Sequence, residues 1–542
     1  MSLESPLLPA LIMIFGTILI GLLPSLLRSF TFILLPLISL ACLWSQPSVS
    51  NLSLVFGTIF TLVASLGGVY AWHLNDRLQQ MAALLYAGAA VGVVLVKDFY
   101  SLFIFWELMA IGSTYLIWAR KTPESAQTGM RYLLNHIFGG GLLFAGILLH
   151  VHQTGSTALQ ALPDNFDLSS LLILAGVALN TAIPPLHAWL PDAYPKATLT
   201  GSVFMSAFTT KSAVYVLMIL FPGWDMLVGL GVLMTLYGVA YAILANDIRS
   251  ILSYHIISQV GYMVTGVGIG TQLALNGAAA HAFCHILYKS LLFMGAGTII
   301  HATGKSKLTE LGGLASSLRL PLFLYMIGAV SISGFPLFNG FTSKSLIIAS
   351  AGEAHYEWTL LLLLLASTGT FLSVGLKLPI FTWLGTAKTP HTVKTLPQGM
   401  LVAMSITSLL CFLFGVYPSL LYRFLPYPVT YQPYTVYHLV ETTQILLFTF
   451  LGFWLLRKKL VGEDSLVLDV DWFYRKSGKY FKYVFVDFTA FIFSQVALTV
   501  HKITDASILY FNRKDNNTSA SIYTVSAGTL LLLALLGLAF FK

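Results

Sequence analysis

The chain has 542 residues, of which 57% are hydrophobic and 9% are charged. An average soluble domain has roughly a quarter charged residues, so this composition excludes a soluble protein and indicates a polytopic membrane protein. The formal net charge of +8 is accounted for by basic residues beside membrane spans, so no nucleic-acid partner is expected.

Apolar runs of bilayer length predict the membrane spans in chain order. The first run lacks the basic region of a cleavable signal and is expected to be retained. Sixteen spans are predicted, near residues 7–27, 29–46, 51–73, 79–96, 99–118, 128–151, 168–190, 198–221, 226–245, 250–270, 274–300, 318–351, 357–384, 398–418, 436–456 and 521–541.

Basic residues between the spans predict the orientation. Most of them follow odd-numbered spans, whereas Lys97 and Arg423 lie on the other side. The positive-inside rule therefore predicts a multi-pass protein of the cell inner (plasma) membrane with its N-terminus outside.

The spans group into six segments. Spans 4–8 and 9–13 form two five-helix units, and a polar, aromatic-rich connector precedes the last span. The connector is predicted to lie on the cytoplasmic side with a lateral amphipathic helix, the alternative being a disordered linker. The segments are N-terminal helices in 1–78, the two units in 79–221 and 226–384, C-terminal helices in 385–456, the connector in 457–520 and a final helix in 521–542.

Glu107 is the one carboxylate in the apolar segment SLFIFWELMAIGSTYLIW at 101–118. An ionisable group inside a span is costly and usually serves proton or ion passage. Glu107 therefore makes transport the leading hypothesis.

Two predicted spans are interrupted by proline or glycine. The first break, NTAIPPLHAWLPDAYP at 180–195, contains Pro184 and Pro185, and the second, SGFPLFNGFTSKS at 333–345, contains Pro336. A broken helix is tolerated where it is packed in protein or lines a hydrated cavity, and paired breaks point to transporter repeats. Two proline kinks that only shape packing are the alternative.

Titratable side chains inside the spans suggest a proton path. Burial disfavours the charged form of a lysine, which lets it accept and release protons. The histidines 281 and 285 and Lys289 follow i, i+4, i+8 spacing, so they share one helix face over about 12 Å. Lys377 could instead extend towards the interface. The lysines are Lys211, Lys289, Lys344 and Lys377, and the row is His281, His285 and Lys289.

Three other histidines, His136, His187 and His255, are single residues near a span end or break. A lone histidine in such a place is more often a hydrogen-bonded packing residue than a relay. A structural role is expected for each.

Seven motifs resemble, in order, the antiporter-like proton-translocating subunits of complex I, membrane-bound hydrogenases and Mrp-type cation/proton antiporters. The resemblance covers about residues 50–385, and YHIISQVGYM looks most like the D-subunit group of the Mrp type. It implies an all-α membrane fold with two inverted five-helix repeats, each with a broken helix and a half-channel, joined by a hydrated axis of charged residues. The motifs are LVKDFYSLFIFWELM, PLHAWLPDAYPKAT, SAFTTKSAVYVL, DIRSILSYHIISQVGYM, HAFCHILYKSLLFMGAG, LGGLA and SGFPLFNGFTSK.

The resemblance also implies residue roles. Glu107 matches a glutamate expected to pair with and modulate a nearby lysine, and Lys211 matches a lysine that passes protons towards the centre. The row from His281 to Lys289 matches the central relay, and Lys344 matches the terminal proton donor or acceptor.

Asn180 departs from the family pattern, which usually has a lysine just before the first break. Asparagine cannot titrate, so the first half is expected to lack its usual cation, and Lys211 or ordered water could carry the proton there. Without a cationic partner, Glu107 should favour its protonated form.

No Rossmann glycine pattern, iron–sulfur cysteine cluster or haem motif is found in the sequence, so no cofactor or metal and no self-contained catalytic site are predicted. The three cysteines lie singly in apolar runs. Electrons, if used, are expected to come from partners.

The leading hypothesis is a proton-translocating subunit of a multisubunit Mrp-type sodium/proton antiporter, closest to the D subunit. Other membrane subunits, protons, sodium and lipid are its expected partners. The first alternative is a proton-pumping subunit of a redox-driven complex, which would be a quinone or ferredoxin oxidoreductase or a membrane-bound hydrogenase. The others are a proton-conducting membrane partner of an inorganic carbon uptake enzyme and a structural scaffold.

Overall fold

The computed structural model describes residues 5–386, 393–461, 468–473, 475–476, 483 and 487–512. Throughout these residues the ordered structure is helical, with two isolated β-bridges and no strand. The chain divides into two compact units, Met1–Val467 and Leu468–Lys542. The protein is therefore all-α, as predicted.

The first unit contains three N-terminal helices, two sets that correspond to the predicted five-helix units, and three C-terminal helices. The N-terminal helices are α1 (Leu8–Leu22), α2 (Ser25–Trp44) and α3 (Asn51–Tyr70). The first set is α4 (Arg77–Leu95), α5 (Phe99–Trp118), α6 (Pro123–Thr154), α7 (Leu168–Thr181), α8 (Trp189–Ala193), η1 (Tyr194–Lys196), α9 (Leu199–Ala207) and α10 (Thr209–Leu220). The second set is α11 (Met226–Leu244), α12 (Ile248–Ile269), α13 (Gln272–Thr303), α14 (Arg319–Ser333), α15 (Asn339–Glu353), α16 (Glu357–Thr370), η2 (Phe371–Lys377) and η3 (Ile380–Leu384). The C-terminal helices are α17 (Gln398–Val416), α18 (Ser419–Tyr422) and α19 (Val436–Leu456).

Within the described residues, eleven helices are long and apolar enough to cross a membrane, with α9 and α10 counted as one. Three shorter apolar helices, α1, α7 and α14, are also present. The protein is a multi-pass membrane protein. The count of sixteen spans stays a prediction, and the last predicted span, 521–541, lies outside the described residues.

Both predicted breaks divide a helix in two. α7 ends at Thr181, where Ala182 adopts a left-handed φ of 62°, and α8 begins at Trp189. α14 ends at Ser333, where Gly334 has a φ of 77°, and α15 begins at Asn339. The left-handed residue stops each helix because it turns the chain out of the helical path.

The first three helices of the two sets repeat at a constant interval. α4 and α11 both have 19 residues, and α6 and α13 both have 32. They begin 149 residues apart, 226 minus 77 for the first pair and 272 minus 123 for the second. The same interval separates the two β-bridges, Asp98 with Ala158 and Asp247 with Lys307. The same local fold therefore occurs twice in this part of the chain.

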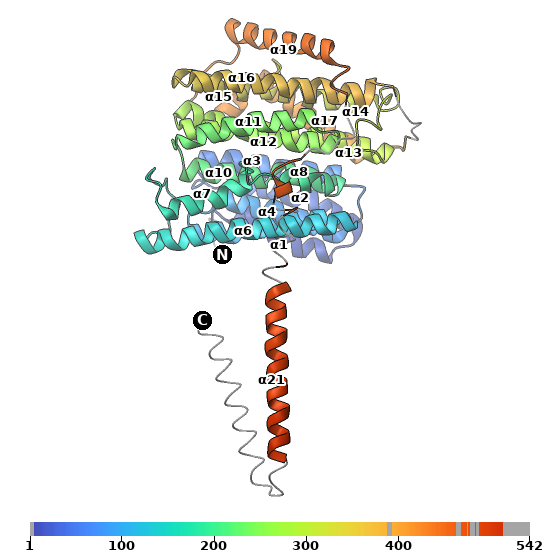
Figure 1. Ribbon diagram of the computed structural model, residues 1–542. Coiled ribbons are helices and arrows are strands. Elements are labelled where there is room, and N and C mark those ends of the chain that lie inside the picture. The colour runs from blue at the N-terminus through green and yellow to red at the C-terminus, as the bar shows by residue number, and fades with distance from the viewer. Residues whose placement is uncertain are drawn as a thin grey trace. The chain divides into compact units, whose positions relative to one another are not determined.

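α13 is the central helix of the second set. It packs against α3, α9, α12, α14, α15 and α17, and almost every residue from Ala274 to Ile299 is buried. α19 packs against η2 and α16. Figure 1 shows α19 beside α16, at the edge of the helices. Polar residues on α13 therefore face protein, whereas α19 exposes most of its length.

In the second unit, α21 (Phe488–Asn512) is a helix of 25 residues within the predicted connector. It contains many aromatic and aliphatic residues. Its placement along the membrane surface stays a prediction.

Candidate functional site

The row on α13 is buried and continuous. His281, His285 and Lys289 are each 0% exposed. The ring centroids of the two histidines are 6.2 Å apart, and Lys289 Nζ donates to the backbone oxygen of Leu252 on α12 at 2.8 Å. The i, i+4, i+8 spacing thus places three titratable groups in the interior of the helix bundle.

His285 is the distinctive member of the row. Neither of its ring nitrogens has a hydrogen-bond partner among the described residues. A buried polar group left without a partner costs about 1–3 kcal/mol, and such groups normally bind protein or ordered water. The position is therefore suited to bind a water molecule or to accept a proton passing along the row.

Contacts join this row to α15. His281 Nδ1 shares a hydrogen bond with Ser343 Oγ at 3.0 Å. The next residue, Lys344, donates from Nζ to the backbone oxygen of Ile332 at 3.0 Å and to Ser367 Oγ at 3.3 Å. Two adjacent residues of α15 thus face the histidine row and the second break.

The second break gives Lys344 its partner. Ile332 lies in the last turn of α14, where backbone carbonyls have no partner inside the helix. A cation at a helix C-terminus is favourable because it meets the negative end of the helix dipole. The Lys344 ammonium also lies 5.1 Å from the ring centroid of Tyr262. The broken helix therefore binds the Lys344 ammonium through a backbone oxygen at its C-terminal end and a serine hydroxyl.

Lys211 lies on α10 next to a second interruption. The predicted span 198–221 is divided at Phe208, which separates α9 from α10. Lys211 Nζ donates across this interruption to the backbone oxygen of Ser206 at 2.6 Å, and the side chain is fully buried. Like Lys344, it is a buried cation bound to backbone at an irregular point of a helix.

Glu107 lies against α6. Its Oε1 atom is buried and makes no hydrogen bond with any described residue. A Cβ atom added to Gly140 would come within 1.9 Å of that oxygen, so alanine at this position would push the carboxyl group out of its present place. In the described part of the chain no lysine or arginine forms an ion pair with Glu107.

Asn180 occupies the last turn of α7 and is 2% exposed. Its Oδ1 atom has no hydrogen-bond partner within the described ranges. The position is therefore buried and polar but uncharged, in agreement with the expectation that the first set lacks a cation there.

His136 on α6 was expected to be a hydrogen-bonded packing residue, and its contacts are a backbone hydrogen bond and two aromatic rings. It donates from Nδ1 to the backbone oxygen of Tyr132 at 2.9 Å, and its ring packs against those of Tyr132 and Trp189. The Nε2 atom is buried and has no partner among the residues that are described. It can therefore accept a proton, one helical turn before Gly140.

The constant interval relates His136 to His285, since 285 minus 136 is also 149. Both residues occupy the same position in the two 32-residue helices. The interval was present in the sequence, and a comparison of the two units would have singled out His136.

Lys377 and His255 make structural contacts. Lys377 Nζ donates to the backbone oxygens of Ile243 and Ala245, the latter at 3.2 Å, at the C-terminal end of α11. This places a cation at a helix C-terminus, where it stabilises unpaired carbonyls. His255 Nε2 shares a hydrogen bond with Ser373 Oγ.

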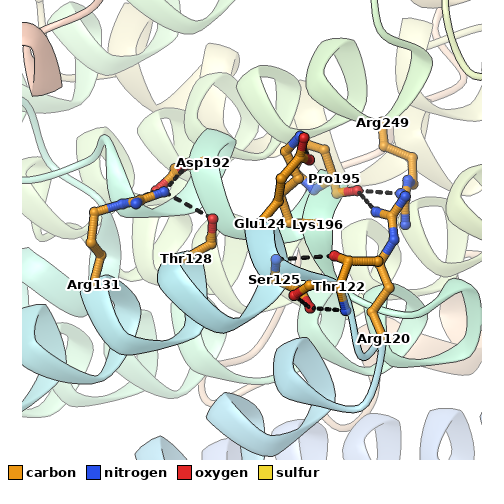
Figure 2. A network of polar contacts seen from close by, with 10 residues as sticks. All are labelled: Arg120, Thr122, Glu124, Ser125, Thr128, Arg131, Asp192, Pro195, Lys196 and Arg249. Atoms are coloured by element: carbon orange, nitrogen blue, oxygen red, sulfur yellow. Dashed lines mark hydrogen bonds and ion pairs between the residues drawn. The ribbon is translucent and has the colours of Figure 1, made fainter.

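A polar network fixes the second half of the first broken helix (Figure 2). Arg131 binds Asp192 of α8 through two hydrogen bonds of 2.9 and 3.1 Å, and Arg120 donates to the backbone oxygen of Pro195 at 2.7 Å. Arg249, which is 2% exposed, donates to the same Pro195 oxygen and to that of Ala197 at 3.0 Å. The break is therefore tied to α5, α6 and α12.

Comparison with known proteins assigns the family. Residues 96–373, just over half of the chain, match the model described as NADH:quinone oxidoreductase/Mrp antiporter, transmembrane. The chain belongs to this family. The resemblance found in the sequence motifs is thus confirmed at the family level.

Relatives include both large and small antiporter subunits. An uncharacterized protein of Methanocaldococcus jannaschii is 28% identical over 70% of this chain and 82% of its own length. The A and D subunits of the Na(+)/H(+) antiporter of Alkalihalophilus pseudofirmus are each 30% identical, over 69% and 55% of this chain. The matched regions span 52% of the A subunit and 66% of the D subunit.

Three solved assemblies contain chains of the same fold. They are the Mrp complex from Dietzia sp. DQ12-45-1b (TM-score 0.68, 21% identity, 82% of this chain and 100% of that one), an archaeal membrane-bound sulfane sulfur reductase (0.69, 22%, 82% and 98%) and respiratory complex I from Thermus thermophilus (0.67, 20%, 77% and 98%). At these identities the likeness concerns the fold.

Proposed function

We propose that the chain is a proton-translocating subunit of a multisubunit membrane complex, most similar in role to an Mrp-type sodium/proton antiporter subunit. The observation that carries this proposal is the buried row of His281, His285 and Lys289, in which His285 has no hydrogen-bond partner among the described residues. A packed membrane core gains little from such a row, and an internal proton path requires one.

The pathway runs through side chains on neighbouring helices. Glu107 and Lys211 serve the first set, the α13 row forms the centre, and Lys344 is the terminal donor or acceptor. The contacts of His281 with Ser343 and of Lys344 with Ser367 support the passage from the row to α15. Lys377, which donates to a backbone oxygen at the end of α11 as the other lysines do to theirs, is kept as a further member of the proposed pathway.

The two sets are proposed to be inverted repeats. Their order and their interval of 149 residues support an internal duplication. Five crossings per unit would place the second copy in the opposite orientation in the membrane, and the N-terminus is proposed to lie outside. The broken helices would then lie at matching depths, as in transporters built from inverted repeats.

The first set is proposed to work without a lysine at position 180. His136 matches His285 by the repeat interval and has a free acceptor nitrogen among the described residues, so it is assigned the proton-carrying role beside Glu107. Lys211 then passes the proton towards the α13 row.

A second candidate is the proton-pumping subunit of a redox-driven complex. The chains of the Mrp complex, the sulfane sulfur reductase and complex I match with TM-scores of 0.68, 0.69 and 0.67, so the fold favours none of these assemblies. Assignment to the D type of Mrp subunits rests on the YHIISQVGYM motif; the A and D relatives are equally similar, at 30% identity each.

Proton flux tests the proposal. Flux is measured in inverted vesicles that contain the native complex, without an electron donor. Wild type is compared with Lys344→Ala and, as a matched control, with Lys97→Ala, because Lys97 is exposed. Sodium- and pH-dependent flux is expected in wild type and Lys97→Ala and lost in Lys344→Ala, while the amount of assembled complex stays the same.

Two other outcomes would change the conclusion. Flux that appears only after a reductant is added would assign the pathway to the redox-driven candidate. Wild-type vesicles with no flux under gradients, reductants or inorganic carbon would favour the structural scaffold and overturn the proposal.

A further inference from the structure

A small cavity lies beside Lys344 and reaches the C-terminal helix α19. Its lining comes from three places: the second break, α16 and the first turns of α19. Among the lining residues are Ser333, Gly334, Lys344, Ser367, His438 and Glu441. The cavity thus places the terminal lysine of the proposed pathway opposite a histidine and a carboxylate.

The cavity has room for water. Its volume is about 40 Å³, which exceeds the roughly 10–15 Å³ that a cavity needs to hold a water molecule. Lys344 faces this space, because Ser367, whose hydroxyl lies 3.3 Å from Nζ, is also part of the lining. A proton leaving Lys344 therefore has a polar route towards α19.

His438 and Glu441 form a pair at the start of α19. His438 Nδ1 lies 3.7 Å from Glu441 Oε2, and the side chains are 21% and 27% exposed. His438 Nε2 also shares a hydrogen bond with the Tyr431 hydroxyl at 3.0 Å. Both ring nitrogens thus face polar groups, and the pair reaches the cavity on one side and the surface of the protein on the other.

Stability does not account for this pair. A partly exposed pair at i, i+3 on a helix contributes only about 0.2–0.5 kcal/mol. Neither residue lies within the family-matched segment 96–373.

We propose that His438 and Glu441 form a proton-exchange gate between Lys344 and the aqueous phase. The N–H bond of the Lys344 ammonium breaks and its proton passes through cavity water to the Glu441 carboxylate, leaving a neutral amine and a neutral acid. Glu441 then passes the proton to His438, which releases it to the solution. Uptake follows the reverse order. In the orientation proposed above, the gate opens to the outside.

The inference rests on the proposed function, and its test separates the two. Proton flux is measured in vesicles containing the native complex and normalised to assembled complex, for Glu441→Gln and for His438→Gln. Each substitution keeps the size of the side chain and removes its proton exchange. The controls are Glu357→Gln and His355→Gln, because both side chains are exposed and neither lines the cavity.

Flux is expected to fall by about tenfold or more in each gate variant, a scale in keeping with loss of a positioned proton donor or acceptor, and to stay at the wild-type level in both controls. Flux in the double variant should be no lower than flux in whichever single variant conducts less, because the two residues act in series. If wild type conducts, Lys344→Ala does not, and both gate variants conduct normally, the gate is overturned while the proposed function stands.

Chemical rescue distinguishes proton exchange from a structural role. In His438→Ala, imidazole added on the side of the gate is expected to restore flux, and imidazole confined to the other side is not. A loss of flux that imidazole restores from neither side would assign His438 a structural role and overturn the gate. Absence of flux in wild type would instead contradict the proposed function.

Discussion

At the scale of single residues, the carboxyl group of Glu107 owes its position to a missing side chain. Gly140 leaves the space that Oε1 occupies, whereas the neighbouring Gly141 has open space where a Cβ would lie. Both are helical glycines of α6. The two positions therefore form a matched pair for testing whether the placement of Glu107 matters.

We expect Gly140→Ala to reduce proton flux to the level of Glu107→Gln, and Gly141→Ala to leave it unchanged. Alanine is favoured over glycine inside a helix by roughly 0.5–1 kcal/mol, so loss of helix stability cannot explain a loss of flux in Gly140→Ala alone. The measurement is sodium-dependent flux per assembled complex. Equal flux in the two alanine variants would show that the position of the Glu107 carboxyl group does not matter for proton transfer.

At the scale of elements, the breaks work because neighbouring helices take over the hydrogen bonds that the helix gives up. Arg120 and Arg249 share the Pro195 oxygen (Figure 2), and Arg249 also donates to the Ala197 oxygen. A broken helix is tolerated in a bilayer only when its backbone groups are satisfied in this way.

Arg249→Gln is expected to lower the stability of the purified complex by about 2 kcal/mol, since it removes charged hydrogen bonds and leaves the Ala197 oxygen unpaired. Thermal unfolding in detergent measures the effect. Arg319→Gln is the control, because Arg319 is exposed at the start of α14. In the Arg120→Gln/Arg249→Gln double variant, the loss of stability should exceed the sum of the two single losses, because the Pro195 oxygen then loses both donors. An additive result would refute the shared bond.

Sequence patterns predicted several elements well. Proline and glycine located both breaks, since clusters of these residues favour the end of a helix through local backbone geometry. The spacing of the α13 row placed three groups on one face, because helical periodicity depends only on local geometry. The division of span 198–221 at Phe208 was missed, since no proline or glycine marks it.

At the scale of the whole molecule, the fold is shared by chains of an Mrp complex, a sulfane sulfur reductase and respiratory complex I, so partner subunits are needed to assign the type of complex. Purification of the complex from its native membrane, followed by mass spectrometry, identifies them. We expect small hydrophobic antiporter subunits. Iron–sulfur proteins would instead support the redox-driven alternative, and a soluble zinc protein would support a role in inorganic carbon uptake.

The sequence by itself determined the membrane class, the broken helices, the α13 row and the family, because composition, helical period and ordered motifs are local properties of the chain. Tertiary structure alone decided which side chains meet: Glu107 with Gly140, Lys377 with the end of α11, and Lys344 with the cavity below α19. Residues far apart in the chain become neighbours through the packing of whole helices, and helical period indicates a face without saying what lies opposite it.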